Sequence, residues 1–196
     1  MFRFDNKYRK LGYKFIAGID EAGRGPLAGP VVAAAVILPA NLKIPGINDS
    51  KLLTAKQRNL LFNIIIKKSL SVTTSVLDSK IIDSINIFNA TYTAMKHCVA
   101  KLTLKPDIIL IDGPYKIPGL NKYLQKPVIK GDKLSASIAC ASIIAKVTRD
   151  RIMEELHRHY PQYDFITHKG YPTKRHKSLI KQHGLSPVHR LTFKYE

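Results

Sequence analysis

Acidic residues stand directly after two short apolar runs of this 196-residue sequence. Residues 15–19 lead into Asp20 and Glu21, and residues 108–111 end in Asp112. The ends of buried strands meet at one edge of a sheet, where ligands commonly bind. The chain has only 14 acidic residues against 32 lysines and arginines. Carboxylates gathered at such an edge therefore suggest a divalent-cation site that faces a polyanion.

Each of these acids also has an ordinary structural interpretation. Adjacent side chains on a regular strand point to opposite faces, so Asp20 and Glu21 can share a metal only if the chain bends there. Otherwise Asp20 begins a turn and Glu21 is a solvated charge, and Asp112 forms a turn with the following glycine. Asp132 precedes a small-residue helix and suits a helix cap. Asp150 lies between two arginines, which favours a surface charge network.

Two glycine-containing segments could bind a ligand. In Gly23-Arg24-Gly25 the glycines let the backbone approach a ligand closely, and Arg24 can pair with a phosphate. The alternative is an ordinary hairpin turn; a dinucleotide loop is rejected because a strand follows instead of a helix. Farther on, Tyr171 could stack on a sugar or base while Lys169 holds a phosphate, or both could belong to a surface loop.

The overall charge favours a nucleic-acid partner. The formal net charge is +18 and the pI is near 10, and a membrane surface is the weaker alternative. The longest apolar run, residues 31–38, is too short to cross a bilayer, and the first ten residues lack a signal sequence, so we expect a cytoplasmic protein. Cys98 and Cys140 fit buried core positions, and the scattered histidines disfavour a zinc site.

The hydrophobic pattern predicts an α/β fold with a mixed sheet flanked by helices. Strands are expected at residues 14–20, 30–38, 71–77, 107–112 and 127–129, the first two as a hairpin. Helices are expected at residues 54–68, 86–102, 135–157 and 173–183, the first with a capping box. We expect one domain spanning residues 1–196, with a core at about 14–160 and a basic C-terminal arm at about 161–196.

Several motifs occur in the same order as in a known family. They lie at residues 17–26, 48–51, 111–113, 130–132, 137–150 and 168–173. The sequence resembles ribonuclease HII, the bacterial type 2 ribonuclease H, over residues 16 to about 193. The resemblance implies a ribonuclease H-like fold with a five-stranded mixed sheet.

The resemblance also implies a metal-dependent endoribonuclease. The family's four acids correspond to Asp20, Glu21, Asp112 and Asp132, with the first three as the firmest metal ligands. They would hold two Mg²⁺ or Mn²⁺ ions around the scissile phosphate. The expected substrates are RNA/DNA hybrids and DNA duplexes with embedded ribonucleotides, and the expected products carry a 5′-phosphate and a 3′-hydroxyl.

Substrate contacts follow from the same resemblance and from the basic composition. The loop at Gly23, Arg24 and Gly25 would read the ribose 2′-hydroxyl, and Tyr171 would stack at the RNA-to-DNA junction. The candidates for phosphate contacts are Lys51, Lys130, Lys169, Lys174 and Arg175. Because such contacts release counterions, binding should weaken steeply with salt.

Ribonuclease HIII carries an extra N-terminal domain, and only 19 residues precede Asp20 here, so we expect ribonuclease HII rather than ribonuclease HIII. Residues 191–196 show no evident sliding-clamp motif, which leaves a clamp partner open, and the protein is expected to be a monomer. The chain could instead be a basic nucleic-acid-binding protein without catalysis. A third possibility is a transposase- or resolvase-like nuclease, which would also cut all-DNA duplexes.

Overall fold

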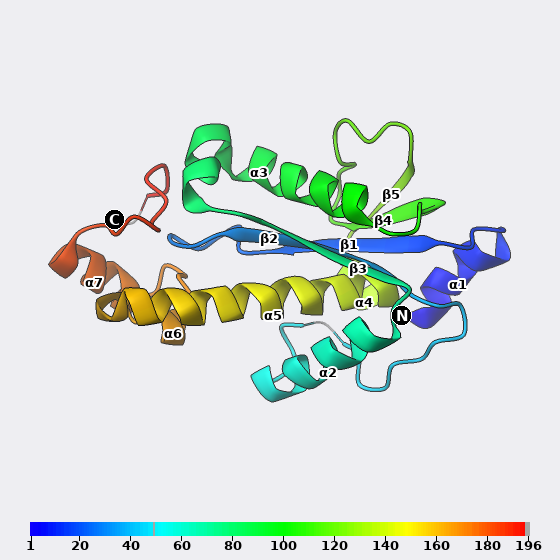
Figure 1. Cartoon of the computed structure of the whole chain (residues 1–196), viewed down its shortest axis with the longest axis horizontal. Coiled ribbons are helices and arrows are strands. Elements are labelled where there is room, and N and C mark those ends of the chain that lie inside the picture. The colour runs from blue at the N-terminus through cyan, green and yellow to red at the C-terminus, as the bar shows by residue number, and fades with distance from the viewer. Residues whose placement is uncertain (49, 195–196) are drawn as a thin grey trace.

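A five-stranded mixed sheet forms the centre of the molecule (Figure 1). The computed structural model describes residues 1–48 and 50–194, so Asp49 of the second motif and the last two residues of the chain lie outside the described residues. The strands run in the order β3-β2-β1-β4-β5. Their bounds are β1 Ile16–Ala22, β2 Val31–Ile37, β3 Ser71–Leu77, β4 Ile108–Asp112 and β5 Leu124–Val128. The predicted mixed α/β sheet is confirmed.

Strand β1 lies between an antiparallel and a parallel half of the sheet. It pairs antiparallel with β2, which continues the antiparallel half into β3. On its other side β1 pairs parallel with β4, and β4 pairs parallel with β5. Because β1 and β4 are parallel neighbours, their carboxyl ends meet at the same edge of the sheet.

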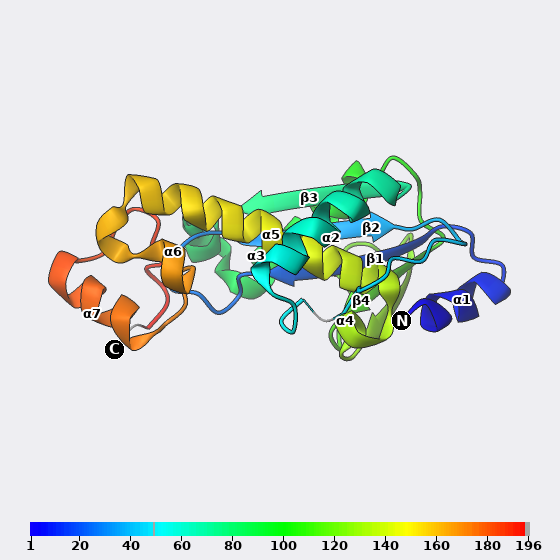
Figure 2. The ribbon, with the colours of Figure 1, turned by 90° about the horizontal axis from the view of Figure 1, so that it is seen from below.

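Helices cover both faces of the sheet. Helix α3 (Ser79–Lys101) lies on one face, and α5 (Ala136–His159) crosses the other, with α2 (Ala55–Lys68) packed outside α5 (Figures 1 and 2). Side chains of β1 alternate between these layers, so Ala17 and Ile19 join the core under α3. Ile16 faces the opposite side, where it packs with Ile138 of α5.

Gly18 allows α5 to approach β1 closely. A Cβ atom at this position would overlap the backbone of Ser137 and Ile138 in the first turn of α5. No other residue type leaves that space, so the helix axis lies directly against the strand. As a result the next turns of α5 pass over the carboxyl end of β1.

Most predicted elements are present, with some shifted boundaries. Helix α2 begins with the expected capping box between Thr54 and Gln57, α5 begins after the Ser135 cap, and α7 spans Lys174–His183. Cys98 and Cys140 are fully buried, as expected.

Three expectations about elements were incomplete. Helix α3 begins at Ser79 instead of Asn86, but it is broken at Asn86, whose side chain accepts a hydrogen bond from the Asn89 amide and caps the second segment. Strand β5 begins three residues earlier than expected, at Leu124. The helices α1 (Phe2–Lys10), α4 (Gly131–Leu134) and α6 (Phe165–His168) were not predicted. No helix in the described part of the chain is long and apolar enough to cross a membrane.

Candidate active site

Asp20 and Asp112 are brought together by the register of two parallel strands. Ile19 of β1 pairs with Ile111 of β4, so the following residues, Asp20 and Asp112, are neighbours at the carboxyl ends of these strands. The side chain of Asp20 is buried, with 5% relative exposure, on the face covered by α5. Two acids separated by 92 positions thus meet because the sheet places β1 beside β4.

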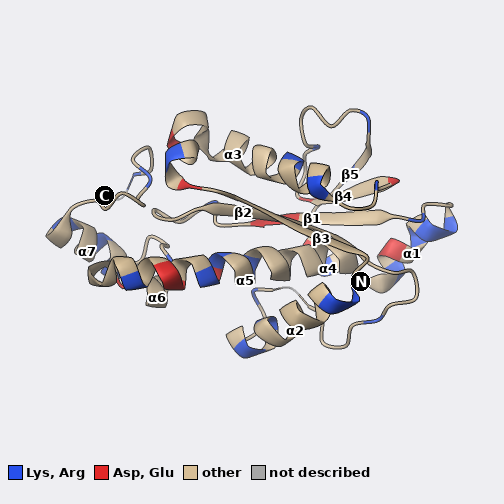
Figure 3. Cartoon of the chain, in the orientation of Figure 1, with Lys and Arg blue, Asp and Glu red and all other residues tan. Residues whose placement is uncertain are grey.

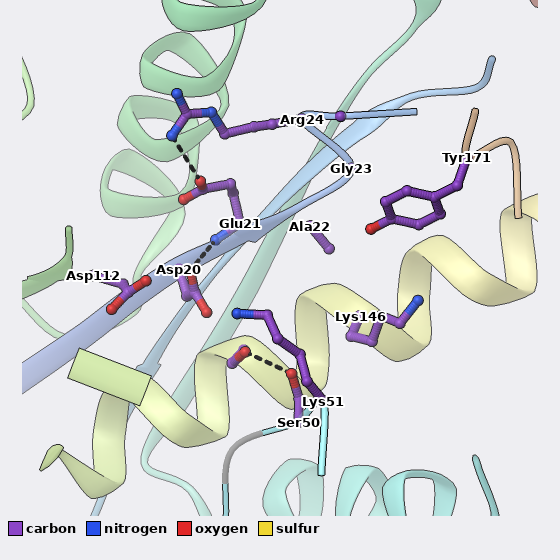
Figure 4. Close-up of a pocket in the computed structure, with 12 residues that line it drawn as sticks. Asp20, Glu21, Ala22, Gly23, Arg24, Ser50, Lys51, Asp112, Lys146 and Tyr171 are labelled. Atoms are coloured by element: carbon purple, nitrogen blue, oxygen red, sulfur yellow. Dashed lines mark hydrogen bonds and ion pairs between the residues drawn. The ribbon is translucent and has the colours of Figure 1, made fainter. Parts of the chain in front are cut away.

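A pocket of about 250 Å³ opens at this edge of the sheet. Figure 4 shows the carboxylates of Asp20, Glu21 and Asp112 beside it, with the Lys51 ammonium pointing toward them. The Gly23-Arg24-Gly25 loop and Tyr171 line the same pocket. Eight of the residues singled out in the sequence therefore lie around one pocket: Asp20, Glu21, Gly23, Arg24, Gly25, Lys51, Asp112 and Tyr171.

The chain does not bend between Asp20 and Glu21. Strand β1 stays paired with β2 through Ala22, so the two side chains leave opposite faces of the strand. Glu21 Oε1 lies 3.4 Å from the Arg24 guanidinium in an ion pair. Consistent with this, no three His, Cys, Asp or Glu side chains of the described residues form a ready metal-ligating group. The ion pair is made through Oε1, so the Glu21 carboxylate keeps a second oxygen, Oε2, with which it could approach a cation.

The pKa values of the three carboxyl groups Asp20, Glu21 and Asp112 are all raised. Burial raises the pKa of Asp20 well above its ordinary value, and the charges of Glu21 and Asp112 raise it further. Burial likewise raises the pKa of Glu21, with Arg24 opposing it. The pKa of Asp112 is raised by burial and then by the charge of Asp132. A divalent cation at this point would offset both the desolvation and the repulsion.

Asp132 is a close neighbour of this group. It is buried in the short helix α4, and its carboxylate lies 3.5 Å from the Lys51 ammonium. The amides of Gly131 and Asp132 donate hydrogen bonds to Asp112 Oδ1, at 2.7 and 3.3 Å. The structure thus links Asp132 to Asp112 through the backbone of α4 and to the pocket through Lys51.

Two buried arginines support the Gly23-Arg24-Gly25 loop. Arg190, with 1% exposure, donates hydrogen bonds to the carbonyls of Gly23 (2.6 Å), Arg24 (3.0 Å) and Gly29 (3.0 Å). Arg149 donates to the carbonyls of Ala28, Pro30 and Lys169. Gly23 has φ +100°, and a Cβ there would overlap the Arg149 side chain. The loop carbonyls therefore point inward to these guanidinium groups.

Sequence reasoning missed several residues of the pocket. Ser142 and Lys146 project from successive turns of α5, and Ser142 exchanges a 2.9 Å hydrogen bond with Ser50. The Lys146 ammonium lies 5.8 Å from the centre of the Tyr171 ring. The i, i+4 spacing of Ser142 and Lys146 within the small-residue helix was a usable signal, since it places both on one helix face. No sequence signal connected Arg149 and Arg190 to a loop more than a hundred residues away.

Four of the proposed phosphate contacts lie outside this pocket. Lys130 is exposed before α4. Lys169 pairs with Glu154 at 2.8 Å over a different depression. Lys174 and Arg175 lie in the first turn of α7, and Arg175 pairs with Asp164. Their contact with phosphate stays a prediction.

Asp150 belongs to a charge network rather than to the acid cluster. Its carboxylate lies 2.8 Å from Lys146 Nζ and 3.8 Å from Arg58 Nη2. Figure 3 shows how the charges divide on a larger scale, with acidic residues on β1 in the middle of the molecule and many lysines and arginines on the surrounding helices.

The family profile described as Ribonuclease HII matches residues 17–196. The chain belongs to the ribonuclease HII family. It is 52% identical over 192 residues to a ribonuclease HII of Caldicellulosiruptor bescii, covering 98% of this chain and 92% of the relative. The crystal structure of ribonuclease H2 from Pyrococcus horikoshii is similar, with a TM-score of 0.75 and 30% identity over 92% of this chain and 94% of that one.

A second solved structure shows the same fold in an assembly. Ribonuclease HII of Archaeoglobus fulgidus, solved in complex with PCNA, is 27% identical with a TM-score of 0.75, covering 92% of this chain and 95% of that chain. The expected ribonuclease H-like fold is confirmed. Family membership makes the chain a ribonuclease H, an endoribonuclease of RNA/DNA hybrids, in a divalent-metal-dependent family. The interpretation as a binding protein without catalysis was wrong.

Proposed function

We propose that this ribonuclease HII cuts both RNA/DNA hybrids and DNA duplexes with embedded ribonucleotides, using divalent cations held by Asp20, Glu21, Asp112 and Asp132. The main support is the set of carboxylates at the ends of β1 and β4, of which Asp20 is buried and Glu21 and Asp112 are half-buried, and whose pKa values are raised by burial and mutual repulsion. Carboxylate oxygens are the ligands that Mg²⁺ and Mn²⁺ prefer. The donor set therefore fits such ions.

The bound ions, which we propose to be two Mg²⁺ or Mn²⁺, would supply an activated water and charge stabilisation of the leaving 3′-oxygen. The protein side chains do the positioning. Asp112 is oriented by the amides of Gly131 and Asp132, and Asp20 accepts a 2.7 Å hydrogen bond from the Glu21 amide. The products would then carry a 5′-phosphate and a 3′-hydroxyl.

Recognition of the ribonucleotide is assigned to the loop and to Tyr171. The backbone at Gly23 and Gly25 lines the pocket, where it can approach a ribose 2′-hydroxyl, the group that distinguishes RNA from DNA. Arg24, Lys51 and Lys146 would contact phosphates around the acids. Tyr171 is 41% exposed at the pocket edge, which suits stacking at an RNA-to-DNA junction.

The test is cleavage of four labelled substrates: a DNA duplex with one ribonucleotide, a continuous hybrid, an all-DNA duplex and an all-RNA duplex. Each is incubated with Mg²⁺, with Mn²⁺ or with a chelator, and the ends are mapped. We expect cutting of the first two only, loss of cutting with chelator, and 5′-phosphate ends. Equal cutting of the all-DNA duplex, or full activity in chelator, would contradict the proposal.

A further inference from the structure

Three histidines are buried together behind Tyr171. His168, His176 and His189 are 7%, 0% and 2% exposed, and they come from α6, α7 and the C-terminal segment. The rings of His168 and His176 stack with centroids 4.2 Å apart, and those of His176 and His189 are 5.2 Å apart. None of the three lines the acidic pocket. Neither the sequence reasoning nor the proposed chemistry assigns them a role.

The hydrogen bonds of this cluster determine which nitrogen of each ring carries the proton. The Ser186 amide donates to His189 Nδ1 at 2.9 Å, so Nδ1 is the acceptor and Nε2 carries the hydrogen. His189 Nε2 therefore donates to His176 Nε2 at 3.1 Å. His176 is then protonated at Nδ1, which donates to the Tyr171 carbonyl at 3.0 Å. Ser186, His189, His176 and Tyr171 form one directed relay, which we call the imidazole relay.

Neighbouring contacts hold the same stretch of backbone. The Gly170 amide donates to His168 Nδ1 at 3.1 Å, so His168 Nε2 donates to the Tyr163 carbonyl at 2.7 Å. The Tyr171 carbonyl also accepts from the Thr173 amide at 2.8 Å, so two donors hold it. The peptide group before the Tyr171 Cα is held as well, because the Tyr171 amide donates to the His168 carbonyl at 2.9 Å and the Gly170 carbonyl accepts from the Leu27 amide at 2.8 Å.

Burial keeps both imidazoles of the relay neutral, so that each ring carries one N–H. It lowers the pKa of His176 and of His189 to about 4, and the neighbouring histidines add to the effect. A second proton on His176 would lie on Nε2 and face the Nε2–H of His189 across the 3.1 Å contact, and a second proton on His189 would lie on Nδ1 and face the Ser186 amide at 2.9 Å. Near neutral pH both rings are therefore neutral, and the direction of the relay is fixed.

The Tyr171 ring is 41% exposed and lies near two cations, the Lys146 ammonium at 5.8 Å and the Arg149 guanidinium at 5.7 Å. Arg149 is fixed by its own hydrogen bonds to backbone carbonyls. The direction of the ring therefore depends on the backbone from which it projects, together with this contact to Arg149. Displacements of about 1 Å in a positioning group can cost a reaction roughly 100-fold.

We propose that His176 and His189 are positioning residues for Tyr171, and that their relay sets the preference of the enzyme for a single embedded ribonucleotide over a continuous hybrid. This inference rests on the proposed junction role of Tyr171. The two histidines touch neither substrate nor metal. They act by fixing the carbonyl, and with it the Cα–Cβ direction, of the residue that stacks at the junction.

Two substitutions at His176 separate positioning from simple packing. His176→Asn places an amide nitrogen near the position of Nδ1, where it can donate to the Tyr171 carbonyl. His176→Gln places its amide near Nε2, where it can accept from His189 but cannot reach Tyr171. Both variants keep a polar amide and lose the ring, so they are matched in chemistry. His183→Gln, at an exposed position of the same helix, is the control.

The measured quantity is the ratio of kcat/KM on a DNA duplex with one ribonucleotide to kcat/KM on a continuous hybrid. We expect His176→Gln to lower this ratio about tenfold. This is less than the roughly 100-fold loss that a displaced positioning group can cause, because the Thr173 amide still holds the Tyr171 carbonyl. His176→Asn and His183→Gln should stay within about twofold of wild type. Equal ratios in the Asn and Gln variants would overturn the proposal, because packing alone would then account for the cluster.

The Tyr171→Ala variant separates failure of this inference from failure of the proposed function. If Tyr171→Ala lowers the ratio and His176→Gln does not, the relay is overturned while the junction role stands. If Tyr171→Ala leaves the ratio unchanged, the junction role and the relay both fail. Adding His176→Gln to Tyr171→Ala should change the ratio no further, and a further fall would overturn the relay.

A second pair of variants, at His189, tests the same relay if the His176 variants do not fold. His189→Gln retains a donor to His176 Nε2, whereas His189→Leu removes it. Melting temperatures of all variants are recorded, so that only folded proteins are compared. We expect the ratio to fall in His189→Leu and to be retained in His189→Gln; equal ratios would overturn the proposal.

Discussion

At the scale of single residues, the acids were the most predictable part of the site. Asp20 and Asp112 follow apolar runs, and the parallel pairing of β1 and β4 brings such positions together. The sequence could not show that Glu21 pairs with Arg24, because that depends on which face of β1 each side chain takes. Arg190 was also beyond prediction, since its contacts with Gly23 and Arg24 join positions more than 160 residues apart.

Gly23 and Gly25 should respond differently to the same change. Gly23→Ala forces a Cβ into Arg149 at φ +100°, so we expect a loss of about 1–3 kcal/mol in the free energy of unfolding together with weaker cleavage. Nothing lies within 4 Å of a Cβ at Gly25. The free energy of unfolding of Gly25→Ala should therefore lie within about 0.5 kcal/mol of the wild-type value. Urea unfolding measures both. Equal destabilisation would mean that Arg149 does not constrain the loop.

At the scale of elements, the long periodic segments were predicted and the short or irregular ones were not. Helix α2 carried its capping box in the sequence, and α5 its run of small residues. Helix α1 was missed because its anchor is tertiary: Asp5 accepts hydrogen bonds from Ser135 and Ser137 at the start of α5. The early start of α3 was missed because Asn86 interrupts the helix with φ 62°.

The C-terminal segment should hold the Gly23-Arg24-Gly25 loop through Arg190. Lysine at this position keeps a charge but has one ammonium group, which cannot bind the three carbonyls of Gly23, Arg24 and Gly29 together. We expect Arg190→Lys to lower the free energy of unfolding by about 2–4 kcal/mol and to weaken cleavage. Arg158→Lys is the matched control, because the Arg158 side chain is 76% exposed. Similar stability of the two variants would refute the role of Arg190 in holding the loop.

At the scale of the whole molecule, the imidazole relay should make stability depend on pH. His176 and His189 have pKa values lowered to about 4, against 6.5 for an ordinary histidine. Between these values the unfolded chain binds protons that the folded chain does not, so stability is lost as pH falls from about 6.5 to 4. The loss is at most about 3.4 kcal/mol for each imidazole.

The comparison of wild type with His176→Asn isolates this effect. The raised pKa values of Asp20, Glu21 and Asp112 act in the opposite direction, but they are common to both proteins. We expect the variant to show a slope of stability against pH that is shallower by up to about 1.4 kcal/mol per pH unit in this window. Identical slopes from denaturation series would show that His176 does not titrate as the buried contacts require.

The most direct measurement is calorimetric titration with Mn²⁺, paired with cleavage of a DNA duplex containing one ribonucleotide, for wild type, Asp20→Asn, Asp112→Asn and Glu155→Gln. Glu155 lies on the exposed part of α5 and controls for loss of one negative charge. We expect both aspartate variants to lose at least about 100-fold in cleavage and to bind Mn²⁺ more weakly, while still binding the duplex. Glu155→Gln should match wild type. Wild-type metal binding and cleavage in Asp20→Asn and Asp112→Asn would contradict the account.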